Sequence, residues 1–313
     1  MVASLPAERS GDPPTRAGTL RRLVTGNRQT LIGLGALGVF AVVALAASLI
    51  APTGINTQFA TGFAPPSGGH PLGLDGGGFD VFTRLVHGAR TSLLVGSVAA
   101  LVGMLIGGVI GVVAGYFGGR TDGVLMRVTD YFLVIPDIPL MIVAAAVFGQ
   151  NLANIVIVIG LVYWASTARL IRAQVMSVRQ RTFVRRVEAM GASPLSVLVR
   201  HVVPHVMPLL LANTVLMVAN AIFAETYISF LGLGDPSVVS WGRMIQDALD
   251  QGAVLAGAWW VVLPPGLAVT LVVLAATVAG QGMEDTLNPR LKVGHLAVRR
   301  FRVRPLNGRL QGA

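Results

Sequence analysis

Two histidines, His201 and His205, have a spacing that could support metal chemistry. They are four residues apart, which on a helix places both imidazoles on one face, as in a metal-binding pair. Pro204 lies between them, however, and no carboxylate or cysteine that could complete a ligand set is close in the sequence. We therefore expect no metal site. The chain contains no cysteine, which also excludes disulfides and thiol chemistry.

Nucleotide hydrolysis is a second chemistry that the residues argue against. The chain has a single lysine, Lys292, which follows Arg290 and Leu291. A P-loop needs glycine before the lysine and serine or threonine after it, so no such site exists here. A nucleophile paired with a base, as an intramembrane enzyme would need, is not evident either. We expect a protein that is not an enzyme and that binds no cofactor directly.

Carboxylates within apolar sequence form the next group of interest. Asp130 and Asp137 fall in a hydrophobic stretch, and Asp137 stands between Pro136 and Pro139. A carboxylate at membrane depth costs a few kcal/mol unless it is paired or faces water, on the order of 3 kcal/mol by insertion scales. These residues either border a polar cavity or cap a helix that the prolines break, and the second interpretation is favoured. Glu225 is expected to accept hydrogen bonds from the loop that follows it rather than to relay protons.

Two asparagines share a face with a methionine. Asn213 and Asn220 are seven residues apart, with Met217 between them, so all three project from one side of a helix. This face is a candidate lining for a translocation path. The same pattern is also typical of polar contacts that hold membrane helices together.

The most unusual stretch is the elbow, residues 185–208, which interrupts the apolar sequence with Arg185, Arg186 and Arg200. Gly191 suits the position after a helix end, because it accepts a left-handed backbone. Ser193 suits an N-cap and Pro194 the first helical turn. The pattern therefore predicts one short helix that ends near 190 and another that starts at 194.

The second of these helices has an apolar stripe. Its members follow the i, i+3, i+4, i+7 spacing: Leu195, Leu198, Val199 and Val202. Pro204 and Pro208 then bend the chain. The elbow is either an interfacial helix beneath the lipid headgroups or a surface presented to a partner protein, and its helix caps favour the partner.

The elements around these residues are those of a membrane protein. The 313 residues are 53% hydrophobic and 12% charged, with a mean hydropathy of +0.70, about half the usual charge of a soluble domain. A span needs about 20 apolar residues. Six stretches qualify: 30–51, 92–115, 130–149, 152–171, 206–227 and 258–280. The first is expected to be retained as a span that also serves as the targeting signal.

Positive charge fixes the expected orientation. The chain has 24 lysines and arginines and a net charge of +10. With the N-terminus inside, all of them fall in cytoplasmic segments except Arg84, Arg90 and Arg243. This asymmetry predicts a multi-pass protein with both termini in the cytoplasm. Because the charge is spread over separate loops, a nucleic-acid partner is not expected.

Small residues mark one helix face for close packing. Gly103, Gly107, Gly111 and Gly115 recur every four residues within the second span. Such spacing lets two helix backbones approach closely. The partner is either a helix of the same chain or a second subunit, and the sequence does not decide between them.

Several stretches together resemble one family of transporters. The elbow has Gly191 followed, after nine residues, by His201-x-Val203-Pro204, which is similar to the cytoplasmic Glu-Ala-Ala loop of ABC-importer permeases. Five further stretches, in the same order, resemble the C-type permease subunit of dipeptide, oligopeptide and nickel importers: HPLGLDGGGFDVFTRLVHGARTSL (70–93), GYFGGRTDGVLMRVTD (115–130), ETYISFLGLG (225–234), SWGRMI (240–245) and LNPRL (287–291). The resemblance extends from about residue 27 to residue 291.

The resemblance implies a fold and a division of the chain. The fold is the all-α, six-helix type I importer permease with a cytoplasmic coupling loop. Residues 1–28 are expected to be a cytoplasmic tail, 29–90 the first span with an extracytoplasmic segment, 91–282 the permease core with its coupling loop at about 173–205, and 283–313 a basic cytoplasmic tail.

The resemblance also implies which residues contact the motor. The ATPase-coupling loop would include Arg185, Arg186, Val187, Met190, Gly191, Ala192 and Pro204. The family's Glu-Ala-Ala positions fall here on Arg185, Arg186 and Val187. A positive charge thus replaces the usual acidic contact, while Gly191 and the elbow remain.

The function implied is that of a pore subunit of an ATP-driven importer in the bacterial plasma membrane, for di- or oligopeptides. Its expected partners are a second permease, two ATPase subunits that use ATP and magnesium, an extracytoplasmic substrate-binding protein and the lipid membrane. The alternative is a secondary transporter that works alone on an ion gradient. That class expects inverted repeats and mid-membrane carboxylates, and both signals are weak here.

Overall fold

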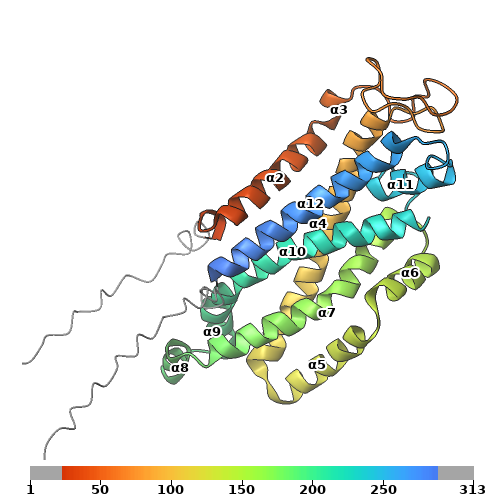
Figure 1. The fold of residues 1–313 in the computed structure, drawn as a ribbon. Helices are drawn as coiled ribbons and strands as arrows, with labels where there is room; N and C mark the ends of the chain where they lie inside the picture. The colour runs from red at the N-terminus through yellow and green to blue at the C-terminus, as the bar shows by residue number, and fades with distance from the viewer. Residues whose placement is uncertain (1–22, 288–313) are drawn as a thin grey trace, which may run out of the picture.

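The protein is an elongated bundle of helices (Figure 1). This computed structural model describes residues 23–287, and no β-strand occurs among them. The all-α architecture expected from the sequence is therefore confirmed. In chain order the helices are α2 (Arg28–Leu45), α3 (Ala47–Ile50), α4 (Val81–Phe117), α5 (Gly119–Val134), α6 (Asp137–Phe148), α7 (Leu152–Arg179), α8 (Thr182–Ala189), α9 (Pro194–Val197), the π-helix η1 (Leu198–Val202), α10 (Val203–Phe230), α11 (Trp241–Asp250) and α12 (Trp259–Leu287).

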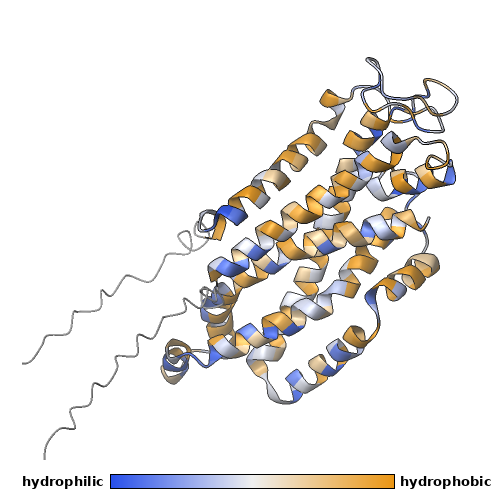
Figure 2. Ribbon diagram, viewed as in Figure 1, coloured by the Kyte–Doolittle hydropathy of each residue, from blue (hydrophilic) through white to orange (hydrophobic). Residues whose placement is uncertain are grey.

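Five helical stretches are long and apolar enough to cross a membrane. They are α2, α4, α7, the continuous helix Pro194–Phe230 and α12. Each overlaps one of the predicted spans, although the first predicted span, 30–51, is divided between α2 and α3. Figure 2 shows apolar residues along most of their length, including outward-facing turns. Large side chains such as Leu105 and Leu271 are exposed there, as expected for helices in contact with lipid.

The remaining predicted span, 130–149, has a different form. It is a bent pair, in which α5 and α6 meet at 88°. Pro136 explains the break, because proline disfavours helical geometry at the residue before it. Ile135 accordingly has an extended backbone, with φ −75° and ψ 126°. The helical part also begins earlier than predicted, at Gly119 rather than 130. Counted as one span, the pair brings the possible total to six among residues 23–287.

The centre of the bundle is the close pairing of α4 with α7. The glycine stripe of α4 faces α7, so that a Cβ at Gly107 would lie 2.3 Å from the carbonyl oxygen of Trp164, and one at Gly111 would lie 2.5 Å from that of Ala168. Gly115 meets Arg172 in the same way. The sequence left open whether the glycine face packs on a helix of the same chain or on a second subunit. In the fold it packs on α7 of the same chain.

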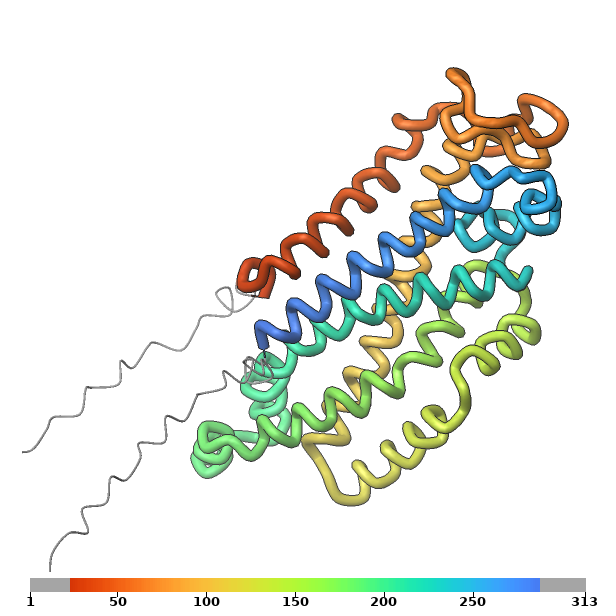
Figure 3. Tube along the Cα trace, viewed as in Figure 1, coloured from red at the N-terminus to blue at the C-terminus, as the bar shows by residue number. Residues whose placement is uncertain are grey.

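The two ends of the bundle differ in character. Figure 3 shows the start of α2, the end of α12 and the elbow gathered at one end. The opposite end carries the crown, which comprises residues 51–80 and α11 (Figure 3). The long helices connect these two ends.

The crown is held by a charged and aromatic network. Arg84 lies 3.0 Å from Asp75 and 3.7 Å from Asp247, and its guanidinium lies 3.9 Å from the ring centroid of Phe79. Burial raises the pKa of Asp75 above its ordinary value, although Arg84 and two backbone N–H groups oppose the shift. The crown is therefore fixed to the first turns of α4.

Candidate functional site

The elbow has the helix–turn–helix form expected from the sequence. Helix α8 ends at Ala189, and Gly191 adopts φ +84°. The N–H of Ala192 donates to the carbonyl oxygen of Val187, and that of Gly191 to the carbonyl oxygen of Glu188. The bond from Ala192 spans the six-residue ring of a Schellman turn, which uses glycine for its left-handed backbone. The predicted helix end near 190 is confirmed.

The second helix of the elbow starts where predicted. Ser193 has an extended backbone and its hydroxyl accepts a hydrogen bond from the N–H of Ser196, at 3.4 Å. Pro194 occupies the first helical turn, where its missing N–H has no partner to lose. The turn between α8 and α9 is thus capped on both sides, and only Met190 to Ser193 lie outside a helix.

A compact apolar cluster joins the elbow to the bundle. Val184 of α8, Val197 of α9 and Val202 of η1 are fully buried against Val175 and Val178 of α7. The predicted stripe is divided by this packing, since Leu198 and Val202 face the cluster while Leu195 and Val199 are exposed. The elbow is therefore anchored through its inner face and presents a partly apolar outer face.

The tip of the elbow is open to solvent. Met190 is 77% exposed and Leu195 is 66% exposed. Arg185, Arg186 and Gly191 are also exposed. Val187, Ala192 and Pro204 are half-buried at its base. An exposed methionine beside exposed leucine and arginine is typical of protein contacts.

A π-helix lies inside the elbow, between α9 and α10. The N–H of Val203 donates to the carbonyl oxygen of Leu198, five residues back, instead of to the fourth. The next residue, Pro204, has no N–H to donate, and Pro208 lies one turn further on. Such an interruption in an otherwise continuous helix is a frequent feature of functional sites. The second helix of the elbow thus runs into α10 as one continuous helix, Pro194–Phe230.

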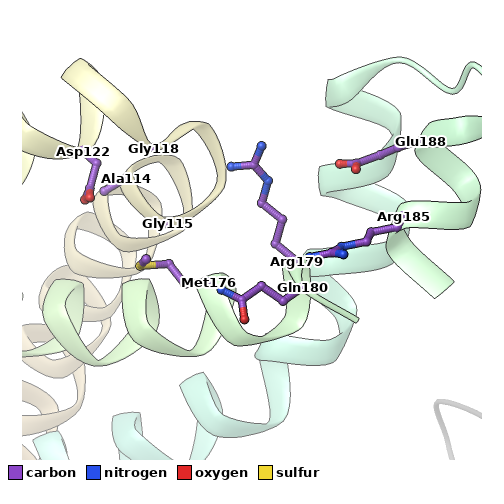
Figure 4. A pocket seen from close by; sticks show the side chains of 9 residues that line it. All are labelled: Ala114, Gly115, Gly118, Asp122, Met176, Arg179, Gln180, Arg185 and Glu188. Atoms are coloured by element: carbon purple, nitrogen blue, oxygen red, sulfur yellow. The ribbon is translucent and has the colours of Figure 1, made fainter. Parts of the chain in front are cut away.

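An open cavity of about 320 Å³ lies between the elbow and the turn that joins α4 to α5. Figure 4 shows Arg179 of α7 extending into this space, with Glu188 of α8 pointing toward it from the other side. Arg185 also lines the cavity. The guanidinium of Arg179 lies 5.3 Å from the ring centroid of Tyr116, within cation–π range.

Two ion pairs join α5 to α7. Neither was predicted from the sequence. Arg172 contacts both carboxylate oxygens of Asp122, at 2.5 and 2.6 Å. Arg169 lies 2.6 Å from Asp130. The available signal was the spacing of the two arginines, which stand three residues apart on one face of an apolar helix.

The residues predicted to line a path lie in two places. Asn213 donates to the hydroxyl of Thr167, and that hydroxyl lies 3.0 Å from the sulfur of Met217. These two residues thus make polar contacts between α10 and α7, as in the alternative interpretation. Asn220 instead borders a cavity between α6, α7 and α10 that also includes Asp137. The sequence left two interpretations of Asp137, a residue at a cavity or one at the end of a broken helix. In the fold Asp137 both begins α6 and borders a cavity.

Two other candidates have hydrogen-bond partners in the described part of the chain. Glu225 is buried and accepts hydrogen bonds from Ser229 at 2.8 Å and from Ser92 at 3.3 Å. The nitrogen Nδ1 of His205 lies 2.6 Å from the carbonyl oxygen of His201, and its ring stacks on Phe183. Within residues 23–287 no group of three or more His, Cys, Asp or Glu side chains is placed to hold a metal ion.

The sequence matches the model of a known protein family. Residues 107–293 match the model of the binding-protein-dependent transport system inner membrane component. This range contains α7, the whole elbow, α10 and α12, and it covers more than half of the chain. The chain belongs to this family of inner-membrane permeases. Its fold is the type I importer permease fold expected from the sequence.

Curated relatives extend the similarity beyond that range. The dipeptide transport system permease protein DppC of Bacillus subtilis is 35% identical over 273 residues, covering 87% of this chain and 85% of the relative. The oligopeptide transport system permease protein OppC of the same organism is 32% identical over 268 residues, covering 85% and 87%. The glutathione transport system permease protein GsiD of Pectobacterium atrosepticum is 34% identical over 228 residues, covering 72% and 75%.

The family match establishes the class of protein. The permeases of this family are components of transport systems and are not enzymes themselves. This chain is accordingly a multi-pass membrane permease. Its elbow is exposed at the tip and packs on α7 through the apolar cluster at that end of the bundle.

Proposed function

We propose that this chain is a pore-forming permease subunit of an ATP-driven importer for di- or oligopeptides. The observation that carries the proposal is the similarity to dipeptide and oligopeptide permeases over at least 85% of this chain, together with the capped elbow at the end of α7. The substrate would cross by alternating access, with the bundle opening to one side of the membrane and then to the other.

The elbow is the proposed site at which a separate ATPase subunit docks. The residues assigned to this contact are Arg185, Arg186, Val187, Met190, Gly191, Ala192 and Pro204. ATP and magnesium would be bound and used by the partner subunits. The physical requirement on the elbow is stiffness, because a lever must transmit motion through a short contact. The Schellman turn, the Ser193 cap and the buried valines supply this stiffness.

The charge of the elbow bears on the choice of partner. Arg185 stands where the family pattern has glutamate, and it is exposed at the edge of a cavity that also contains Arg179. A docking surface on the ATPase with an acidic residue at this point complements that charge. The proposed assembly contains two ATPase subunits, a second permease and an extracytoplasmic binding protein.

The proposed orientation places the elbow and both termini in the cytoplasm of a bacterial cell. The distribution of arginines supports it, since Arg84, Arg90 and Arg243 are the only lysine or arginine residues outside the segments expected to be cytoplasmic. The crown then faces outward, where a binding protein delivers the substrate. Among the predicted path residues, Asn220 is the one whose surroundings in the bundle suit contact with a substrate.

Reconstitution tests the proposal. The chain is purified with its second permease and ATPases, inserted in liposomes, and supplied with the binding protein and a labelled dipeptide. We expect uptake that requires ATP, and we expect none from the chain alone. Uptake by the chain alone, driven by an ion gradient, would contradict the proposal and favour a secondary transporter.

A further inference from the structure

A second cavity lies toward the crown end of the bundle, between α6, α7 and α10. Its volume is about 260 Å³. The polar residues that line it are Asp137, Tyr163, Tyr227 and Asn220, and Phe223 also borders it. The wall therefore combines one acid with three aromatic rings and several oxygen atoms.

Asp137 reaches this cavity because the chain bends there. Helices α5 and α6 meet at 88°, and Asp137 is the first residue of α6. Of its two carboxylate oxygens, one accepts a hydrogen bond from the N–H of the adjacent Ile138, at 3.0 Å. No further hydrogen bond or ion pair to Asp137 is found within residues 23–287.

The other aspartates of the bent pair have a different environment. Asp122 is bound by Arg172, and Asp130 by Arg169. All three carboxylates lie in α5 or α6, which together form one candidate membrane span. Asp137 alone among them has no cationic side chain within 4 Å in the described part of the chain.

An ionised carboxylate in a membrane-spanning segment is costly unless it is compensated. The start of α6 supplies part of that compensation through its free N–H groups. The side chain of Asp137 is exposed and borders the cavity, so that a cation entering the cavity can supply the rest. Aromatic rings also favour a cation, which their negative faces attract. The cavity thus has the composition of a site for a positively charged group.

We propose that this cavity binds the primary ammonium group of the transported solute, such as the amino terminus of a peptide. The inference rests on the proposed function and adds to it a recognition site inside the permease. An ammonium group has three N–H donors, and Asp137, the amide oxygen of Asn220 and a tyrosine hydroxyl offer matching acceptors. The cavity is slightly below the usual range for small-molecule pockets, about 300–1,000 Å³, so it receives one end of the solute and not the whole of it.

Direct binding tests the site without interference from the binding protein, which has its own selectivity. The permease–ATPase assembly is placed in nanodiscs without the binding protein, and binding of a labelled dipeptide and of its N-acetylated form is measured up to about 10 mM. We expect the free dipeptide to bind about tenfold more tightly than the acetylated one. Asp137→Asn is expected to weaken binding of the free dipeptide about tenfold and to abolish the preference.

Two further variants separate the site from a structural role. Asp137→Glu keeps the charge and is expected to retain the preference. Asp130→Asn removes a carboxylate from the same bent pair, outside the cavity, and is expected to leave binding within about twofold because its ion pair is exposed. Each variant is compared at equal amounts of assembled complex, so that a loss of assembly is recognised.

The outcomes distinguish this inference from the proposed function. If the unaltered assembly imports peptides but shows no preference for a free amino group, or if Asp137→Asn keeps that preference, the site is wrong while the function stands. If the complete assembly imports no peptide, the proposed function fails and the site fails with it. Loss of the preference in Asp137→Asn, with retention in Asp137→Glu and Asp130→Asn, supports the site.

Discussion

At the scale of single residues, Gly191 shows why a backbone angle can matter more than space. Its φ is +84°, and a Cβ added to it would meet no atom within 4 Å. Substitution is therefore opposed by backbone strain and not by a clash. A β-branched residue held in this conformation costs about 1–3 kcal/mol, whereas asparagine tolerates it better.

This contrast gives a matched pair of variants. Gly191→Val is expected to distort the turn between α8 and α9 and to reduce ATP-driven uptake strongly, with ATP hydrolysis and membrane insertion retained. Gly191→Asn is expected to keep most of the uptake. The measurement is the ratio of solute transported to ATP hydrolysed in liposomes. Normal uptake by Gly191→Val, expressed at the usual level, contradicts the lever role of the elbow.

Asp235 provides a test through pH. Burial favours its neutral form, but hydrogen bonds from the hydroxyl and N–H of Ser237 and from the N–H of Leu152 outweigh this and lower the pKa of Asp235 below its ordinary value of 3.8. A lowered folded-state pKa means that the ionised form stabilises the fold. This contribution is fully present above pH 3.8 and is lost as the pH falls through the lowered pKa.

The expected result is a pH-dependent difference in thermal stability. Asp235→Asn should lower the Tm of the solubilised protein at neutral pH, because the loop after α10 loses its contact with the first turn of α7. The difference from the unaltered chain should shrink as the pH falls below 3.8 and through the lowered pKa. Ser237→Ala removes one donor, at 2.6 Å, and should show a smaller effect. A difference in Tm that does not change with pH rules out this role for the Asp235 charge.

Residue identities predicted local geometry better than they predicted partners. Gly191, Ser193 and Pro194 each have a backbone preference that depends on near neighbours, and the elbow follows these preferences. The contact between Asn213 and Thr167 joins residues 46 positions apart. No local rule selects that partner, so the sequence left both interpretations of Asn213 open.

At the scale of elements, the α4–α7 contact has almost no tolerance for added volume. A Cβ on Gly107 would lie 2.3 Å from a backbone oxygen of α7, and backbone cannot move aside as a flexible side chain can. Gly107→Ala is therefore expected to cost about 1–3 kcal/mol by forcing the two helices apart. The measurement is the Tm of the assembled complex in detergent.

A control is available in another span. A Cβ on Gly38 of α2 would meet no atom within 4 Å. Gly38→Ala should leave the Tm unchanged or raise it slightly, since alanine favours helix by up to about 1 kcal/mol over glycine. If both variants have the same Tm, the glycine stripe does not set the distance between α4 and α7.

Helix boundaries were harder to predict where charged residues lie within a membrane-spanning helix. The sequence predicts a span over 130–149, whereas α5 already begins at Gly119. Four charged residues between 120 and 130 made this stretch resemble a loop. In the fold, Asp122 and Asp130 are paired with arginines of α7, which removes much of the cost of their charge. The spacing of Arg169 and Arg172 indicates a charged face on α7, but the fold is needed to show that this face meets α5.

At the scale of the whole molecule, the two ends of the bundle must face opposite sides of the membrane for the proposed mechanism to work. The elbow must meet a cytosolic ATPase, and the crown must meet a binding protein outside. The number of possible spans supports termini on one side if the bent pair crosses once, giving six in total. If the pair instead enters and leaves on the same side, the termini lie on opposite sides.

Cysteine labelling decides between these arrangements, and the chain suits it because it contains no cysteine of its own. Met190→Cys places a thiol at the elbow tip, at a side chain that is 77% exposed. Ser67→Cys places one in the crown, at an exposed polar position with nearly the same side-chain volume. In intact cells that lack the binding protein, a membrane-impermeant maleimide should label Ser67→Cys and not Met190→Cys. Opening the membrane should expose Met190→Cys, and adding the ATPase subunits should protect it again, because docking buries the elbow. Labelling of Met190→Cys in intact cells would reverse the orientation, and the elbow could then no longer be the contact through which ATP hydrolysis moves the bundle.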